Sequence, residues 1–206
     1  MRKVNRVGEK WVTNEGYIIE IIECVNAKNC TIRFEGGVII KNIQHWNIKN
    51  GEIKNPYHKS VHGVGYLGVG KYSYKTHFKI YKTWAGMLQR GYDLKFQERQ
   101  KTYKGCSVDE FWHNFQAFAE WFEKYYKEIH LPIAAKMKDV TKVEATKFLS
   151  APDGGMAAYY RMFEIYFLSP SEMEQTLGSP EGQAVVTDLP NFATGGVTVI
   201  IGQVEN

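Results

Sequence analysis

A long stripe of large apolar side chains in the middle of this 206-residue chain constrains its fold more than any other feature. The stripe recurs at intervals of four and three residues, which is the spacing of one helix face. It predicts an amphipathic helix over residues 109–131, with Ser107 and Glu110 forming a capping box and Pro132 following its last residue, Leu131. We expect the stripe to pack in a core rather than to form a stacking platform. Its members are Phe111, Phe115, Phe118, Phe122, Tyr125 and Ile129.

Before this helix the patterning changes from strands to a helix. Residues 7–55 alternate short β-rich runs with Asn and Gly turns, which predicts a small antiparallel sheet or barrel. Residues 55–76 are rich in Gly, Tyr, His and Lys, with glycines at close intervals, which predicts an irregular loop or hairpin. These glycines match neither the Walker nor the dinucleotide spacing, so we expect no phosphate-binding loop here. Residues 78–92 predict a second amphipathic helix with a basic outer face.

After the long helix the order strand, strand, helix, strand is expected. The turn residues 151–155 separate predicted strands at 140–149 and 157–168. Ser169 and Ser179 each precede a proline and an acidic residue, which is typical of a helix N-cap.

The predicted strands of the second half also bear on assembly. Residues 197–204 predict the last strand, and large apolar side chains occupy both faces of strand 157–168. The helices of one chain can cover only one of those faces, so we expect a homodimer that covers the other through the C-terminal sheet.

Charge divides the chain into unlike halves. Residues 1–115 carry a net charge of +9, and residues 116–206 carry one of −5. Such asymmetry is typical of two modules of which the first suits a polyanion, although compositional drift can also produce it. We therefore predict an α+β chain with a basic module at 1–115, β-rich and helical, and a second module at 116–206. The helix at 109–131 joins them.

Basic residues concentrate between residues 51 and 104, which hold 11 Lys and Arg against 3 Asp and Glu. Tyrosine and tryptophan residues are interleaved with these cations, as on surfaces that bind nucleic acid. We predict that this surface binds double-stranded DNA, and a solvated basic face without a ligand is the alternative. The predicted contacts are Lys71, Lys75, Lys79, Lys82, Arg90, Lys95, Arg99, Lys101 and Lys104.

Other features narrow the class of protein. No stretch approaches eighteen uninterrupted apolar residues, and no apolar segment follows the basic start, so we expect no membrane span, no signal peptide and a cytoplasmic location. Cys24, Cys30 and Cys106 lack CxxC spacing, which favours free thiols over a disulfide framework or a zinc site. We predict no metal site. No haem, flavin or nicotinamide fingerprint is present, so we predict no cofactor.

Ordered motifs run through residues 1–125. They are Gly51–Tyr57, Gly63–Tyr72, Tyr81–Arg90 and Thr102–Val108, followed by Trp112–Phe115. In these motifs the chain resembles phage-encoded proteins related to HNH-type homing endonucleases, and the resemblance implies DNA binding. The family usually has cysteine where this chain has Gly91 and Asp109. Because no His-Asn-His constellation has the spacing of one metal site, we expect a non-catalytic DNA-binding protein of phage or mobile-element type.

A second set of motifs occupies residues 118–206, at Phe122–Ala134, Ser179–Ala184 and Asp188–Val197. In these motifs the chain resembles the EthD family of dimeric ferredoxin-like α/β-barrel proteins. The resemblance implies a βαββαβ module that dimerises. The aromatic helix stands where the first strand is due, so the module lacks that strand unless Tyr103–Val108 supplies it. A natural fusion, a recombination product and an artificial sequence all fit this double resemblance.

His130 is the histidine of the acidic half and lies near the end of the long helix. The resemblance implies that it faces a pocket between helix and sheet, where it is a candidate general base or a contact for a small organic ligand. A structural histidine bonded to the backbone is the alternative, and Asp188 and Asn191 are expected in turn and cap interactions. The second hypothesis for the whole chain is therefore an EthD-like small-molecule binder or cofactor-independent oxidoreductase, with an incidental basic module.

Overall fold

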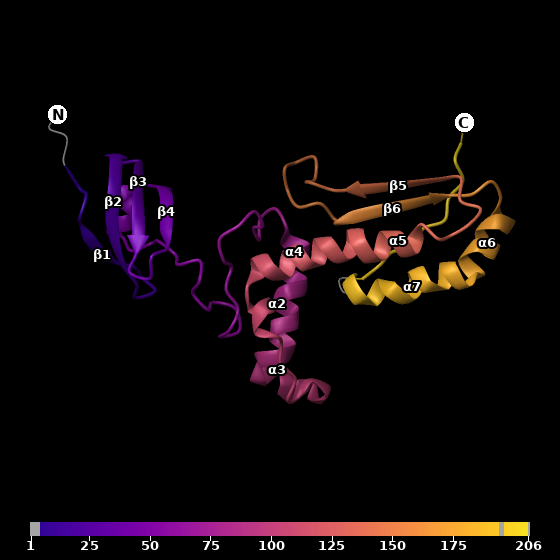
Figure 1. Ribbon diagram of the computed structural model, residues 1–206, viewed down its shortest axis with the longest axis horizontal. Helices are drawn as coiled ribbons and strands as arrows, with labels where there is room; N and C mark the ends of the chain where they lie inside the picture. Colours follow the sequence, from indigo (N-terminus) through magenta and orange to yellow (C-terminus); the bar gives the residue numbers. More distant parts are fainter. Residues whose placement is uncertain (1–4, 194–195, 206) are drawn as a thin grey trace. The chain divides into compact units, whose positions relative to one another are not determined.

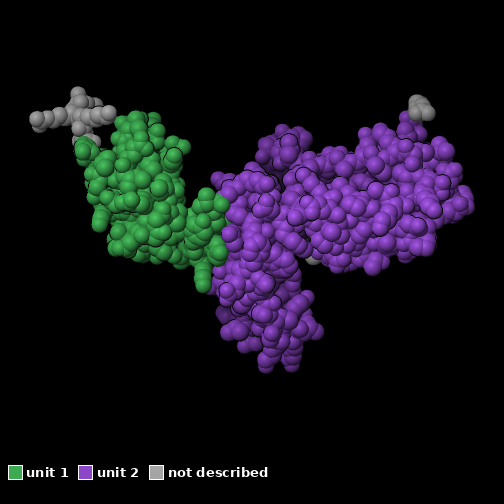
Figure 2. All heavy atoms as spheres, in the orientation of Figure 1, with its two compact units in different colours: residues 1–60, 66–69 green, residues 61–65, 70–206 purple. Residues whose placement is uncertain are grey.

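A computed structural model describes residues 5–193 and 196–205 and separates the chain into two units (Figures 1 and 2). The first contains residues 1–60 and 66–69, and the second contains residues 61–65 and 70–206. Helices and sheets are mixed, in agreement with the predicted class. The module boundary expected after residue 115 falls inside the second unit, where Trp112 and Phe118, one from each predicted module, pack with ring centroids 6.0 Å apart.

A four-stranded antiparallel sheet forms the first unit, as the alternating pattern of residues 7–55 predicts. Its strands pair in chain order, and a short helix α1 (His45–Lys49) follows them. Alternate side chains such as Ile19, Ile21 and Ile32 are fully buried with Ile48 of α1, because one face of each strand turns inward. The strands are β1 (Lys10–Val12), β2 (Ile18–Asn26), β3 (Asn29–Phe34) and β4 (Ile39–Ile43).

Two of the cysteines differ from the prediction of free thiols. The turn between β2 and β3 places Cys24 and Cys30 directly opposite each other, and a disulfide joins them. A separation of six residues fits no CxxC motif, but a tight hairpin brings such residues together across the ladder. Cys106 is free and exposed, as predicted.

The glycine-rich residues 55–76 form the irregular loop that the sequence predicts, with one isolated bridge between Val61 and Gly65. Gly65 permits a close approach to the following helix, because a Cβ atom there would lie 2.4 Å from Cδ1 of Leu88. The end of the loop is fastened by Gln116, whose side chain donates to the carbonyl of Tyr72 and accepts from its amide.

Helix α2 (Phe78–Tyr92) has the bounds that the apolar spacing predicts. Ile80, Trp84 and Leu88 are fully buried on one side, and Lys79 and Lys82 are exposed on the other. Helix α3 (Leu94–Arg99) and the 3-10 turn η1 (Lys101–Tyr103) follow. No strand forms in Tyr103–Val108, so this segment does not supply the missing first strand.

The aromatic helix begins later than predicted. Ser107 caps nothing, because residues 110–113 form a separate 3-10 turn, η2 (Glu110–His113), capped by Asp109. Helix α4 (Phe115–Tyr125) then starts at Asn114, whose side chain accepts from the amide of Gln116. Phe111 therefore lies outside the helix and is 66% exposed.

A π turn then changes the phase of the same helix. Residues Tyr126–His130 form the turn η3, and α5 (Leu131–Ala134) continues beyond Pro132, where the sequence predicted the end. A π turn holds about one residue more than an α turn, so it rotates the following side chains. As a result Tyr126 and His130 are buried, whereas Ile129, predicted for the core, is exposed.

In the C-terminal part of the second unit, a hairpin and a helix lie on different sides of the continuous helix formed by α4, η3 and α5 (Figure 1). Strands β5 (Lys142–Lys147) and β6 (Arg161–Tyr166) pair antiparallel, and α6 (Pro170–Gly178) and α7 (Pro180–Phe192) follow. Ser169 and Ser179 accept from the amides of Glu172 and Gly182, which confirms both predicted caps.

The hairpin is less apolar than predicted. Arg161 contacts Tyr126 of the helix, so residues 161, 163 and 165 turn toward the helices and the alternate residues turn away. The sequence predicted apolar groups on both faces, but Tyr160 and Leu168 lie outside the short strand. The face turned away is mainly polar and carries Lys142, Glu144, Thr146, Met162, Glu164 and Tyr166.

Residues 197–204 form no strand, contrary to the prediction. The described residues 196–205 pair with neither the four-stranded sheet nor the β5–β6 hairpin. Val199, Ile200 and Ile201 are consequently exposed. No helix in the described ranges has the length and apolar character needed to cross a membrane.

Candidate functional site

His130 and Asp188 form a buried pair between the π turn and α7. The Nδ1 atom of His130 lies 2.9 Å from Oδ2 of Asp188. His130 is 4% exposed and Asp188 is 7% exposed, so the pair is shielded from water. His130 bonds to a side-chain carboxylate, whereas the alternative of a purely structural histidine expected a bond to a backbone group. The π turn brings this about, because it turns residue 130 inward in place of residue 129.

Asp188 holds two further polar groups through its other oxygen. The Tyr125 hydroxyl donates to Oδ1 at 2.6 Å, and Nδ2 of Asn191 donates to the same atom at 2.9 Å. Burial raises the pKa of Asp188, but the hydrogen bonds from Tyr125, Asn191 and His130 outweigh it and hold the pKa below its usual value. Asp188 is therefore a carboxylate at neutral pH, and its hydrogen bond raises the pKa of Tyr125.

Aromatic rings enclose the imidazole of His130. The ring of Tyr126 stacks on it at a centroid distance of 5.5 Å, and the ring of Phe192 lies at 4.3 Å. The guanidinium of Arg161, from β6, lies over the ring of Tyr126, with its carbon 3.9 Å from the ring centroid. Tyr126 thus connects the pair on the α7 side of the helix to the hairpin on the other side.

A second polar cluster surrounds Glu123 on the hairpin side. Its carboxylate accepts from Lys147 at 2.8 Å and also from Tyr160 and Arg161. Burial raises the pKa of Glu123. The hydrogen bonds from Lys147 and Tyr160 and the charge of Arg161 lower it by more, so the pKa lies below its usual value. Burial and the bond to Glu123 raise the pKa of Tyr160. Each of these three side chains bonds to Glu123, although Nε of Arg161 is buried without a hydrogen-bond partner in the described residues, so the cluster holds β5 and β6 against α4.

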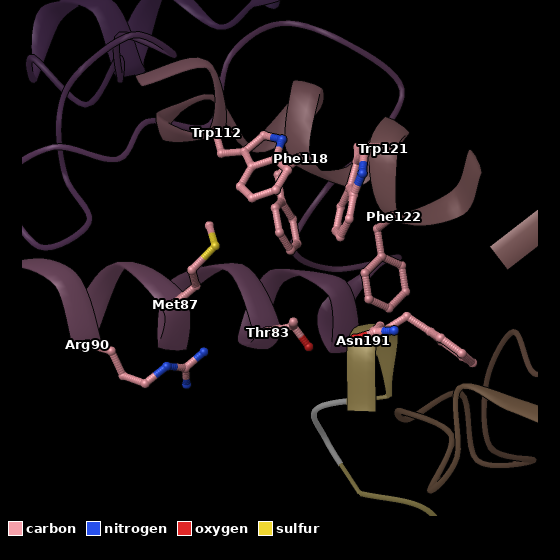
Figure 3. Close-up of a pocket in the computed structure, with 9 residues that line it drawn as sticks. Thr83, Met87, Arg90, Trp112, Phe118, Trp121, Phe122 and Asn191 are labelled. Atoms are coloured by element: carbon pink, nitrogen blue, oxygen red, sulfur yellow. The ribbon is translucent and has the colours of Figure 1, made fainter. Parts of the chain in front are cut away.

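A cavity of about 200 Å³ lies beside the buried pair, among α2, η2, α4 and the end of α7 (Figure 3). Asn191 and Phe192 line it, and these same residues contact Asp188 and His130. In Figure 3 the Met87 side chain rises from α2 toward the rings on the opposite wall. The remaining lining residues are Thr83, Met87, Arg90, Trp112, Phe118, Trp121 and Phe122.

The nine predicted DNA contacts lie on the loop before α2, on α2 and α3, and around η1. Eight are exposed, and none of the nine forms a salt bridge with a described residue. Arg90 differs from the others because it is half-buried along the cavity. The surface therefore presents cations that form no salt bridge with a described carboxylate.

The other histidines do not gather into a metal site. His113 contacts the hydroxyl of Tyr92 at 2.8 Å, and Asn114 caps α4. His45 and His58 lie in the first unit, and His62 approaches Asp93 at 3.7 Å. In the described ranges no three His, Cys, Asp or Glu side chains lie where they could hold a metal ion.

The sequence predicted His130 but missed its partners. Asp188 and Asn191 were expected in turns and caps, whereas both lie within α7, where Asp188 bonds to His130 of the π turn and Asn191 donates to Asp188. A usable signal was present, since Asp188 is in phase with Val185 and Phe192 on the inward side of α7. A carboxylate on such a face requires buried partners.

Comparisons with known proteins place part of this chain in a family. The family model of the EthD domain matches residues 118–196. A curated protein of Rhodococcus erythropolis, described as an uncharacterized 11.0 kDa protein in the thcB-thcC intergenic region, is 34% identical over 93 residues. Those residues make up 45% of this chain and 89% of the relative. The chain belongs to the EthD family.

A solved structure of an EthD family protein from Bacillus halodurans is 25% identical, covering 42% of this chain and 86% of that chain, with a TM-score of 0.40. The EthD region, residues 118–196, contains Tyr125, His130, Asp188 and Asn191. The cavity extends beyond it, since α2 and η2 supply four of its lining residues. None of these matches supports the resemblance of residues 1–125 to HNH-type endonucleases.

Proposed function

We propose that the EthD region binds a small organic molecule and that His130 accepts a proton from it. The observation that carries this proposal is the hydrogen bond between Nδ1 of His130 and Asp188. A carboxylate on one imidazole nitrogen fixes the ring and its tautomer, and it stabilises the cation that forms when the other nitrogen takes a proton. Asp188 is thus a positioning residue, and Nε2 of His130 is the proton acceptor.

The surroundings of Nε2 suit this role. Among the described residues no hydrogen bond to Nε2 is formed, so its lone pair is not already used. The imidazole is covered by Phe192, whose ring also borders the cavity. A molecule held in the cavity would therefore lie against the same ring that contacts His130.

The test uses 4-nitrophenol, a small planar acid whose absorbance reports loss of its proton. We expect the full-length chain to bind it and to increase the nitrophenolate absorbance at a fixed pH near neutrality. His130→Gln removes the acceptor and should abolish the spectral change. His113→Gln is the matched control, because His113 lies on η2 and takes no part in the pair. An unchanged spectrum at saturation, or the same change in His130→Gln, would contradict the proposal.

We also propose that the EthD region is completed by a second copy of the chain in a ferredoxin-like barrel. Every residue of β5 is exposed, and two-stranded sheets are marginal without further strands. Residues 197–204 would carry apolar groups on both faces of a strand, but they have no pairing partner within the described part of the unit. Pairing between copies would cover both the open sheet edge and these apolar groups.

DNA binding by the basic residues is a second candidate function. It is favoured by the exposed cations of α2 and α3, which have no salt-bridge partner among the described residues. Each phosphate that a cation neutralises contributes about 0.9 to the slope of log affinity against log salt. Lys79→Ala with Lys82→Ala should therefore lower that slope by about 2, whereas Lys136→Ala with Lys138→Ala should leave it unchanged. Absence of DNA binding at low salt would rule this function out.

A further inference from the structure

The cavity beside α7 has walls of two chemical kinds. Trp112 and Trp121 lie with ring centroids 4.8 Å apart, and Phe118 lies 5.6 Å from Trp121. Met87 faces these rings from α2 (Figure 3). Large aromatic walls favour a flat apolar ligand, because stacked or tilted rings add attraction to the burial of area. A cavity of about 150 Å³ with apolar walls accommodates benzene, and this one is about 200 Å³.

Arg90 adds a positive charge to this apolar cavity. Its guanidinium packs 5.8 Å from the ring of Tyr103 and forms no salt bridge with a described residue. A half-buried guanidinium offers several donors in a planar fork that matches a carboxylate. The charge is therefore available to a ligand that enters from the side of α2.

We propose that this cavity binds a planar aromatic carboxylate. The rings of Trp112 and Trp121 would contact its aromatic part, and Arg90 would contact its carboxylate. This site goes beyond the proton transfer proposed at His130, because four of its lining residues come from α2 and η2, outside the EthD region, and it requires no reaction. It also gives Arg90 a role different from that of the exposed cations of α2.

The experiment measures binding of naphthalene-2-carboxylate to the full-length chain by calorimetry, with naphthalene-2-carboxamide as the neutral comparison. We expect the carboxylate to bind more tightly than the amide. Arg90→Gln should weaken the carboxylate by about ten- to hundredfold, because a charge-assisted hydrogen bond is lost, and should leave the amide unchanged. Lys79→Gln removes the same charge from an exposed site on α2 and is the matched control.

The position of the ligand is tested separately by magnetisation transfer between the naphthalene protons and the Met87 methyl group. We expect this signal in the wild type. The proposal is overturned if the carboxylate does not bind, if Arg90→Gln and Lys79→Gln weaken it equally, or if the Met87 signal is absent at saturation. The nitrophenol measurement reads a proton transfer instead, so either proposal can fail while the other stands.

Discussion

At the scale of single residues, Asp188 organises the site because it is a buried carboxylate with three hydrogen-bond donors around it. His130 could be singled out from the sequence as the histidine of the acidic half. Its partner could not be assigned, because residues 58 positions apart meet only through the packing of α7 on the π turn. Local rules favoured caps and turns for Asp188, and burial overrode them.

The stability of the chain should reveal this carboxylate through its pH dependence. The folded-state pKa of Asp188 is lowered, so its contribution is present above its unfolded pKa and is lost as the pH falls through the folded value. We expect Asp188→Asn to lower the stability at neutral pH by about 2 kcal/mol and to flatten the loss of stability in acid.

The measurement is the unfolding midpoint of both proteins across acidic and neutral pH. Asp139→Asn is the control, because Asp139 is exposed and the same substitution there should change stability by less than about 0.5 kcal/mol. Equal effects of the two substitutions would mean that the hydrogen bonds of Asp188 do not stabilise the fold.

At the scale of elements, the local signals of the sequence were accurate where a helix depends on its own residues. The bounds of α2 and the caps at Ser169 and Ser179 followed from spacing and side-chain type. The aromatic helix was predicted as one regular element, and the structure divides it into η2, α4, η3 and α5. The π turn could not be predicted, because a periodic stripe does not show where an extra residue is accommodated.

The π turn makes a specific prediction about deletions. Removing Lys127, an exposed residue of the turn, should convert it to an α turn and keep His130 facing Asp188. Removing Glu120, an exposed residue of α4, should rotate Phe118 and Phe122 out of register, because a regular helix has no residue to spare.

Thermal unfolding followed by circular dichroism compares the two deletions. We expect the midpoint of the Lys127 deletion to stay close to the wild type and that of the Glu120 deletion to fall strongly. Comparable losses in both would show that the turn does not absorb a residue.

At the scale of the whole molecule, the residues that follow the EthD region carry apolar side chains that their own unit does not cover. The sequence predicted a third strand at residues 197–204 with apolar side chains on both faces, and the described residues of one chain provide no ladder for it. The sequence pattern alone does not show whether the strand that pairs with residues 197–204 comes from the same chain or from a second copy. The proposed second copy would resolve the difference, because the same residues would then form a strand across the interface.

Light scattering on the full-length chain should therefore report a dimer. Val199→Asp with Ile201→Asp should dissociate it, since both side chains are exposed in the single chain and a carboxylate would be buried in the interface. Leu94→Asp changes an equally exposed apolar residue on α3 and should leave the dimer intact. A monomer in the wild type would exclude the barrel arrangement.

The central claim is that Asp188 holds His130 with Nε2 open as a proton acceptor, and the most direct measurement is the nitrogen-15 spectrum of the histidine side chains near neutral pH. His130→Gln assigns the signal. The account predicts a hydrogen on Nδ1 of His130, and it predicts that Asp188→Asn weakens this preference. A hydrogen found only on Nε2, with Nδ1 bare, would contradict the account.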